Sequence, residues 1–220
     1  RGELVVFSDA NSMYRPDTIR RLVEAFSDES VGYVTGKMIY VTASGTPVGT
    51  GCSAYMRYEN ALRALETRIG SVVGVDGGVD AVRRALYRPM RADQLPDFVL
   101  PLGVVEQGFR VVYQPEAVLK EHSLEDGGSE YRMRVRVALR ALWALRDHAG
   151  LLFGKAGPTF AFQLWSHKVL RYTSAVPLAV AAVLNVVLAT RSSAYLAILA
   201  CQCAFWLAVG IGARGWKLPG

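Results

Sequence analysis

A carboxylate and an amide follow the first apolar run of the chain, residues 4–7. Asp9 and Asn11 are separated by one residue, and two oxygen-bearing side chains at this spacing can reach one hard cation, with a diphosphate completing its shell. Such a cation would stabilise a nucleotide diphosphate as a leaving group. The same pattern is also typical of a plain turn or helix cap.

A second carboxylate, Asp97, stands at the start of an apolar segment, residues 95–102. A carboxylate in this position is most simply a favourable charge at the N-terminus of a helix. Catalysis is the alternative role.

Two further features could bind ligands. Gly77 and Gly78 lie between a predicted strand and a predicted helix, where missing side chains let a ligand approach the backbone. Arg132, Arg134 and Arg136 lie on one basic helix, and their guanidinium groups could hold phosphate oxygens bidentately. The alternative for this helix is a surface that faces water or lipid headgroups.

The elements that must position these residues alternate between apolar runs and helical periodicity. We expect strands at 4–7, 31–41, 71–75 and 110–114, the last stopped by Pro115, and helices over 16–26, 55–69, 79–86 and 97–107. Residues 42–51 are rich in Gly, Ser and Thr and are predicted to form a loop. This alternation predicts an α/β sandwich with a mostly parallel sheet.

The C-terminal part has a different character. A basic helix is predicted over 130–148, and residues 160–172 mix aromatics with Lys168 and Arg171, which is typical of a helix in the membrane interface. We expect His167 to face that interface. The runs 173–190 and 194–212 carry no charged residue, and spanning a membrane takes about 20 residues, with a lower limit near 17. A buried helical hairpin is the alternative.

The composition limits the function classes. The 220 residues carry a net charge of +6, but no aromatic-basic interleaving or motif supports nucleic-acid binding, so we expect no nucleic-acid partner. Arginines gather just ahead of the apolar tail, which predicts a catalytic part in the cytoplasm. The three cysteines have no metal-ligand spacing and fit a reducing compartment.

In their order and spacing, these elements resemble the family 2 glycosyltransferases of the GT-A fold. The likeness is strongest to membrane-bound bacterial enzymes related to cellulose, hyaluronan and poly-N-acetylglucosamine synthases, and it runs over nearly the whole chain. Its most specific segments are residues 2–11, 16–17, 70–74, 97–102 and 163–171.

The resemblance implies roles for both carboxylates. Asp9 and Asn11 match the family's Asp-X-Asp motif, which binds a divalent metal (Mg²⁺ or Mn²⁺) and the nucleotide sugar. Asn11 replaces the second Asp and so removes one charge from the site. Asp97 matches the base that deprotonates the acceptor hydroxyl, although Pro96 stands where the family commonly has an acidic residue.

The glycines and one arginine are matched in the same way. Gly77 and Gly78 resemble the loop near the acceptor sugar. Arg136 is the retained member of a Gln-X-X-Arg-Trp motif and is implied to hold the donor diphosphate. Met133 and Val137 replace the Gln and the Trp, which makes a long processive polymer less certain than sugar transfer itself.

The implied protein is an inverting transferase of the inner (cytoplasmic) membrane, active in bacterial polysaccharide synthesis. It moves a sugar from a UDP- or GDP-sugar donor to a glycan or lipid-linked acceptor. Residues 1–128 would form part of the GT-A domain, 129–172 basic and interfacial helices, and 173–220 a transmembrane hairpin. The family's first strands, which bind the nucleotide, are expected upstream of Arg1, so this chain alone is expected to be inactive.

Two alternatives stay open. A haloacid-dehalogenase-type phosphatase also places Asp-X-Asp after an apolar strand. Asn11 stands where it would need its second acidic residue, and the sequence has no adjacent acidic pair after a second strand to hold magnesium, so both features count against it. A non-catalytic membrane scaffold with a degenerate transferase fold would explain Pro96 and the incomplete arginine motif.

Overall fold

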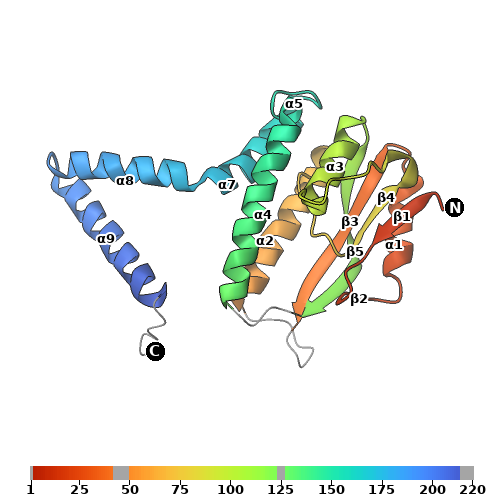
Figure 1. The fold of residues 1–220 in the computed structure, drawn as a ribbon, viewed down its shortest axis with the longest axis horizontal. Helices are drawn as coiled ribbons and strands as arrows, with labels where there is room; N and C mark the ends of the chain where they lie inside the picture. The colour runs from red at the N-terminus through yellow and green to blue at the C-terminus, as the bar shows by residue number, and fades with distance from the viewer. Residues whose placement is uncertain (1, 42–49, 123–126, 214–220) are drawn as a thin grey trace. The chain divides into compact units, whose positions relative to one another are not determined.

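The computed structural model describes residues 2–41, 50–122 and 127–213. Its contacts divide the chain into two compact units, Arg1–Tyr172 and Thr173–Gly220, and each is described by itself. Figure 1 shows the sheet and its surrounding helices in the first unit. Most of the predicted loop at 42–51 lies outside the described residues.

Within the described ranges, five strands form one sheet in the order β1-β4-β3-β5-β2. The strands are β1 (Leu4–Phe7), β2 (Met13–Tyr14), β3 (Val31–Val41), β4 (Asp80–Arg83) and β5 (Arg110–His122). Only the β3–β5 pair is parallel in this sheet, and the other three pairs are antiparallel. The prediction of a mostly parallel sheet was therefore wrong.

The path of the chain after α2 (Thr50–Ile69) explains this difference. Residues 70–79 pass β5, where the Val72 N–H donates to the Val111 carbonyl at 2.9 Å, and reach β3, where the Gly36 N–H donates to the Val79 carbonyl at 2.8 Å. From there the chain turns back, so β4 runs antiparallel to β3 with Asp80 opposite Thr35.

Two element predictions fail along this path. Residues 71–75 do not form the predicted strand, and the predicted helix over 79–86 is β4 followed by a 3₁₀ turn, η2 (Arg84–Leu86). Ala81 and Val82 pack into different apolar clusters on the two faces of the sheet, which is the alternation of a strand.

The last long strand passes the proline that was predicted to stop it. Thr35 pairs with Tyr113 and Lys37 with Val118, so β5 has extra residues at this point, and Pro115 lies among them. A bulge tolerates a proline because the local ladder is already interrupted.

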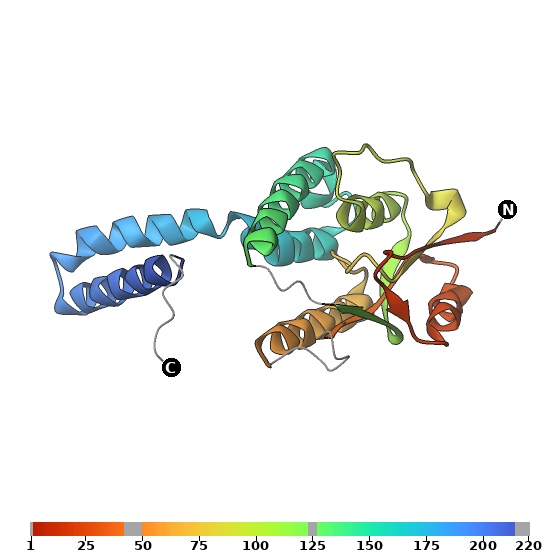
Figure 2. The same cartoon turned by 60° about the horizontal axis from the view of Figure 1, so that its bottom comes forward.

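Helices cover both faces of the sheet (Figure 2). Leu22 of α1 (Thr18–Glu24) and Phe26 of η1 (Ala25–Ser27) close one apolar cluster. The other cluster is closed by helices C-terminal to β4: α3 (Pro96–Glu106), α4 (Gly127–Asp147), α5 (Ala149–Leu152) and α6 (Pro158–Leu164). The predicted helix at 97–107 is confirmed as α3.

The π-helix η3 (Trp165–Val169) follows α6 and leads into α7 (Leu170–Thr173). His167 and Lys168 are buried here, with 9% and 7% of their surface exposed. The prediction that His167 faces a membrane interface was wrong, because its ring packs between two carboxylates of α2.

The second unit contains α8 (Ala175–Ala189) and α9 (Ser193–Ala213), linked by a 2.9 Å hydrogen bond between the Asn185 and Gln202 amides. Both predicted apolar runs are helices. In the described part of the chain, Ser193–Gly212 is by itself long and apolar enough to cross a membrane. The preceding helix, α8, passes the same test only together with Pro158–Thr173.

Candidate active site

Asp9 lies in a turn directly after β1, and the Ser12 N–H donates to its carbonyl at 3.1 Å. The Tyr14 hydroxyl lies 2.7 Å from the Phe7 carbonyl and 2.8 Å from the Gly78 carbonyl. Tyr14 therefore ties the end of β1 to the glycine pair.

Gly77 and Gly78 lie between the two predicted carboxylates. A Cβ atom added to Gly77 would lie 2.9 Å from Asp97 Cγ, and one added to Gly78 would lie 3.2 Å from Asp9 Oδ2. Gly77 also has a φ angle of +97°, which side chains disfavour. The structure thus brings Asp9, Gly77, Gly78 and Asp97 together, from three segments far apart in the sequence.

Asp97 occupies the first turn of α3, directly after Pro96, which starts the helix. Proline suits this position because its missing N–H would have no partner there. Burial raises the pKa of Asp97 to about 6, with a further contribution from the negative charge of Asp9 and partial opposition from a backbone hydrogen bond. A carboxylate with this pKa can accept a proton near neutral pH.

Asn11 contacts a third acidic residue. Its amide nitrogen donates to Glu121 Oε1 at 3.2 Å, which leaves the amide oxygen of Asn11 facing away from that carboxylate. Burial raises the pKa of Glu121, and the nearby charge of Asp9 raises it further. Asp9, Asn11 and Glu121 therefore cluster at one side of the glycine pair.

The oxygen donors of this cluster suit a hard divalent cation. Among the described residues, no group of three His, Cys, Asp or Glu side chains converges closely enough to hold a metal. A cation held by Asp9 and Asn11 alone would keep coordination positions for other ligands, such as a diphosphate.

Arg136 lies elsewhere in the first unit. It lines a groove of about 530 Å³ on α4 together with Asp93, Tyr131 and Trp143, and neither Asp9 nor Asp97 lines that groove. Among the described residues, Arg136 makes no hydrogen bond or ion pair with Asp9 or Asp97. Its role in holding a diphosphate stays a prediction.

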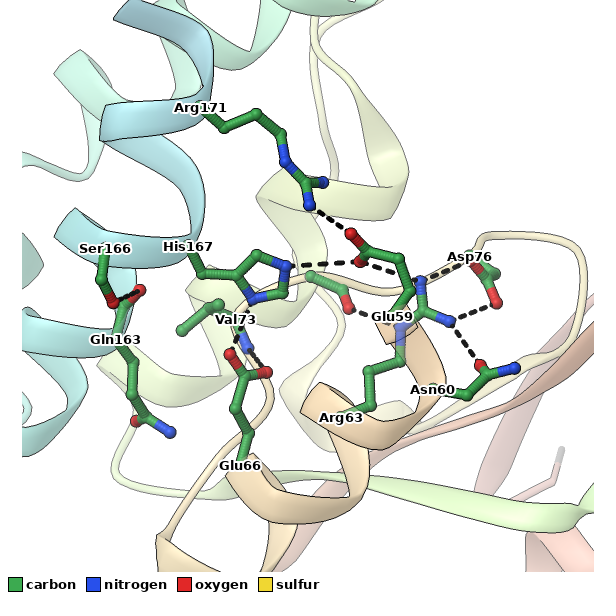
Figure 3. Close-up of polar contacts among 11 residues, drawn as sticks. Glu59, Asn60, Arg63, Glu66, Val73, Asp76, Gln163, Ser166, His167 and Arg171 are labelled. Carbon is green, nitrogen blue, oxygen red and sulfur yellow. Dashed lines mark hydrogen bonds and ion pairs between the residues drawn. The ribbon is translucent and has the colours of Figure 1, made fainter. Parts of the chain in front are cut away.

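Asp76 precedes the glycine pair and is held by Arg63 of α2. The two guanidinium nitrogens of Arg63 each lie 2.6 Å from an Asp76 carboxylate oxygen (Figure 3). Burial raises the pKa of Asp76, and the charge of Arg63 opposes this. The bidentate pair fixes the backbone immediately before Gly77.

No protein-family model matches the sequence, and no curated protein matches it. Among solved structures, the chain is similar to the mannosyltransferase PcManGT from Pyrobaculum calidifontis in complex with GDP-Man and Mn²⁺, with 24% identity and a TM-score of 0.64. The alignment covers 94% of this chain and 56% of that one, so the chain spans little more than half of its neighbour's length. The chain shares the fold of a glycosyltransferase.

Three residues of this site were not predicted from the sequence: Tyr14, Asp76 and Glu121. Tyr14 belongs to a two-residue strand, which is too short to leave a periodic signal. A signal for Asp76 existed in its partner helix, where Glu59, Arg63 and Glu66 recur at helical spacing on one face. Glu121 lies near the carboxyl end of β5, an edge where ligand-binding groups often collect.

Proposed function

We propose that this chain is the part of a family 2 glycosyltransferase of the GT-A type that carries the metal ligands and the general base. It would move a sugar from a UDP- or GDP-sugar to a glycan or lipid-linked acceptor, with inversion at the anomeric carbon. The observation that carries the proposal is the placement of Asp9 and Asp97 against adjacent glycines, Gly78 and Gly77.

Asp97 takes the proton of the acceptor hydroxyl in this proposal. The freed oxygen forms a bond to the anomeric carbon while the bond from that carbon to the diphosphate oxygen breaks, and the electron pair leaves with the diphosphate. The pKa of Asp97, raised to about 6 by burial, leaves the group ionised at neutral pH yet more basic than an exposed carboxylate. The missing side chain of Gly77 lets the backbone lie directly against the Asp97 carboxylate.

Asp9 and Asn11 would hold the divalent cation, with Glu121 orienting the Asn11 amide. The cation, when bound, neutralises charge that develops on the leaving diphosphate. The likeness to a mannosyltransferase solved with GDP-Man and Mn²⁺ supports this assignment.

The apolar helices α8 and α9 would anchor the enzyme in the inner membrane as a two-span hairpin, with the first unit in the cytoplasm. In α9, the stretch Ser193–Gly212 is long and apolar enough to span a membrane, and none of it is buried within the described structure, which supports a lipid-facing role. We assign the reaction to bacterial polysaccharide synthesis on the resemblance alone.

The test uses the full-length protein in membranes, supplied with UDP- and GDP-sugars and Mg²⁺ or Mn²⁺. Asp97→Asn should lower transfer by about 10²-fold or more, the usual contribution of a general base. Asp147→Asn is the matched control, since this surface carboxylate pairs with Arg91. Retained transfer in Asp97→Asn removes Asp97 as the base. A wild type that uses no donor favours the scaffold, and phosphate release from simple esters favours the phosphatase.

A further inference from the structure

Helix α2 carries three charged residues on its buried face. Glu59, Arg63 and Glu66 expose only 3%, 4% and 6% of their surface. Burying a charge is unfavourable unless it is paired, and even paired buried charges contribute little to stability compared with apolar residues of similar size. Their presence on this face therefore calls for a role other than stability.

The outer half of the cluster joins α2 to the π-helix η3. His167 Nδ1 lies 2.7 Å from Glu66 Oε1, and its Nε2 lies 3.3 Å from Glu59 Oε2. Arg171 also contacts Glu59, so this carboxylate lies between an imidazole and a guanidinium group (Figure 3). A π-helical turn is uncommon and is often found at functional sites.

The inner half of the cluster holds the backbone of residues 73–76. Glu66 Oε2 accepts from the Val73 N–H at 3.2 Å, and Arg63 Nε donates to the Gly74 carbonyl at 3.3 Å. Arg63 also makes the two 2.6 Å contacts to Asp76. Three positions in a stretch of four are thus fixed by one helix face.

The fit on the other side of this segment is close. A Cβ on Gly74 would clash with the Lys168 ammonium group, so Lys168 of η3 lies directly against the backbone. Three residues on, a Cβ on Gly77 would lie 2.9 Å from Asp97 Cγ. A displacement of residues 74–76 by a few tenths of an ångström would therefore change the space beside Asp97.

We propose that Glu59, Arg63, Glu66 and His167 form a positioning device for segment 73–78, with Arg63 as its central positioning residue. The device rests on the proposed function, because its purpose is to set Gly77 against Asp97. None of its members is assigned a contact with the substrates. Arg63 acts on the site through its two contacts with Asp76, the residue next to Gly77.

The kinetic test uses full-length protein in membranes. Arg63→Gln and Asp76→Asn should each lower kcat by about 10-fold or more, since small misplacements at a reacting centre have large effects on rate. The KM for the nucleotide sugar should stay within about two-fold, because Asp9 and Asn11 are untouched. The double variant should be no slower than the worse single variant, since both changes break one bridge. Arg63→Lys should recover part of kcat.

Arg83→Gln is the matched control. Arg83 is half-buried and also donates to backbone carbonyls, at 2.7 Å to Val31 and 2.9 Å to Phe26. Among the described residues, it makes no hydrogen bond or ion pair with residues 70–78. At an equal loss of Tm, Arg63→Gln should lose far more kcat than Arg83→Gln. Equal losses of kcat in the two variants would overturn the proposal.

Hydrogen exchange supplies a readout that does not depend on turnover. Arg63→Gln should speed amide exchange in peptides covering 72–79, while peptides from β5 keep wild-type rates. Unchanged exchange at 72–79 would overturn the device even if kcat falls. If the wild type transfers no sugar, the proposed function fails, and the exchange result still decides whether Arg63 holds the segment.

Discussion

Replacing the proposed base should make the protein more stable as well as inactive. The pKa of Asp97 rises from an ordinary 3.8 to about 6, chiefly through burial and then through the charge of Asp9. A difference of about 2 pKa units corresponds to about 3 kcal/mol against the ionised form in the folded state. Because Asp97 is partly open to solvent, about 3 kcal/mol is an upper limit, and we expect about half of it, ~1.5 kcal/mol.

The sign follows from the direction of the shift. A carboxyl whose pKa is higher in the folded state binds its proton more tightly there, so its ionised form weakens the fold above pH of about 6 and has no effect below its unfolded pKa. Asp97→Asn removes the ionised form. At about 2–4 °C per kcal/mol for a chain of this size, Tm at pH 8 should rise by several degrees. At pH 4 the difference should nearly vanish.

The assay is thermal unfolding of the purified full-length protein at pH 4 to 8, followed by tryptophan fluorescence with a chelator present. The chelator matters because a cation at Asp9 would reduce the repulsion of Asp97. Asp147→Asn serves as the control and should not show the same dependence on pH. A Tm for Asp97→Asn that is unchanged or lower at pH 8 would refute the placement of Asp97 in a desolvated site beside Asp9.

Three further variants test other parts of the site. Burial alone would raise the pKa of Glu59, but hydrogen bonds from His167 and Arg171 outweigh this and lower it. The ionised carboxylate of Glu59 therefore stabilises the fold at neutral pH, and this stabilisation is lost on acidification. Glu59→Gln should flatten the fall of Tm below pH of about 5. An equally steep fall would contradict this. Gly77→Ala should abolish transfer, because the new Cβ would lie 2.9 Å from Asp97 Cγ. The control Gly103→Ala should keep transfer, because its Cβ meets nothing within 4 Å. Equal activities of the two variants would count against a close fit of Gly77 to Asp97. Asp9→Asn should raise the Mn²⁺ concentration for half-maximal transfer by about 10-fold, a loss of one charged ligand, and an unchanged Mn²⁺ titration would remove Asp9 as a ligand.

The fold could be predicted where one segment carries a strong local signal. The apolar run at 4–7 and the periodic segments of α1, α2 and α3 were placed correctly within a few residues. Prediction failed for β4, whose four residues are too few to show alternation beside helix-forming neighbours. It also failed for strand direction, because the path of residues 70–79 depends on contacts with β3 and β5 and not on their own sequence.

In the candidate site too, some residues could be predicted from the sequence and others could not. The resemblance in the order of motifs gave roles to Asp9 and Asp97, and the structure places these residues against the adjacent glycines Gly78 and Gly77. The contacts of α2 did not follow, because Glu59, Arg63 and Glu66 are residue types that are usually exposed. Their burial depends on His167, about a hundred residues further along the chain, and such a pairing leaves no local pattern.

The two sides of the glycine pair differ in solvation, and this difference suits the proposed reaction. Asp9 and Asn11 are exposed, so a diphosphate and its cation could exchange with water there. Asp97 and Asp76 are largely withdrawn from water on the other side, where a dry carboxylate is a stronger base. Sugar transfer needs both environments within a few ångströms, because the leaving group must depart while the attacking oxygen loses its proton. Arg63 is buried and pairs with Asp76, so its positive charge offsets the negative charge of that carboxylate. This pairing lets Asp76 and Asp97 both lie on the side withdrawn from water.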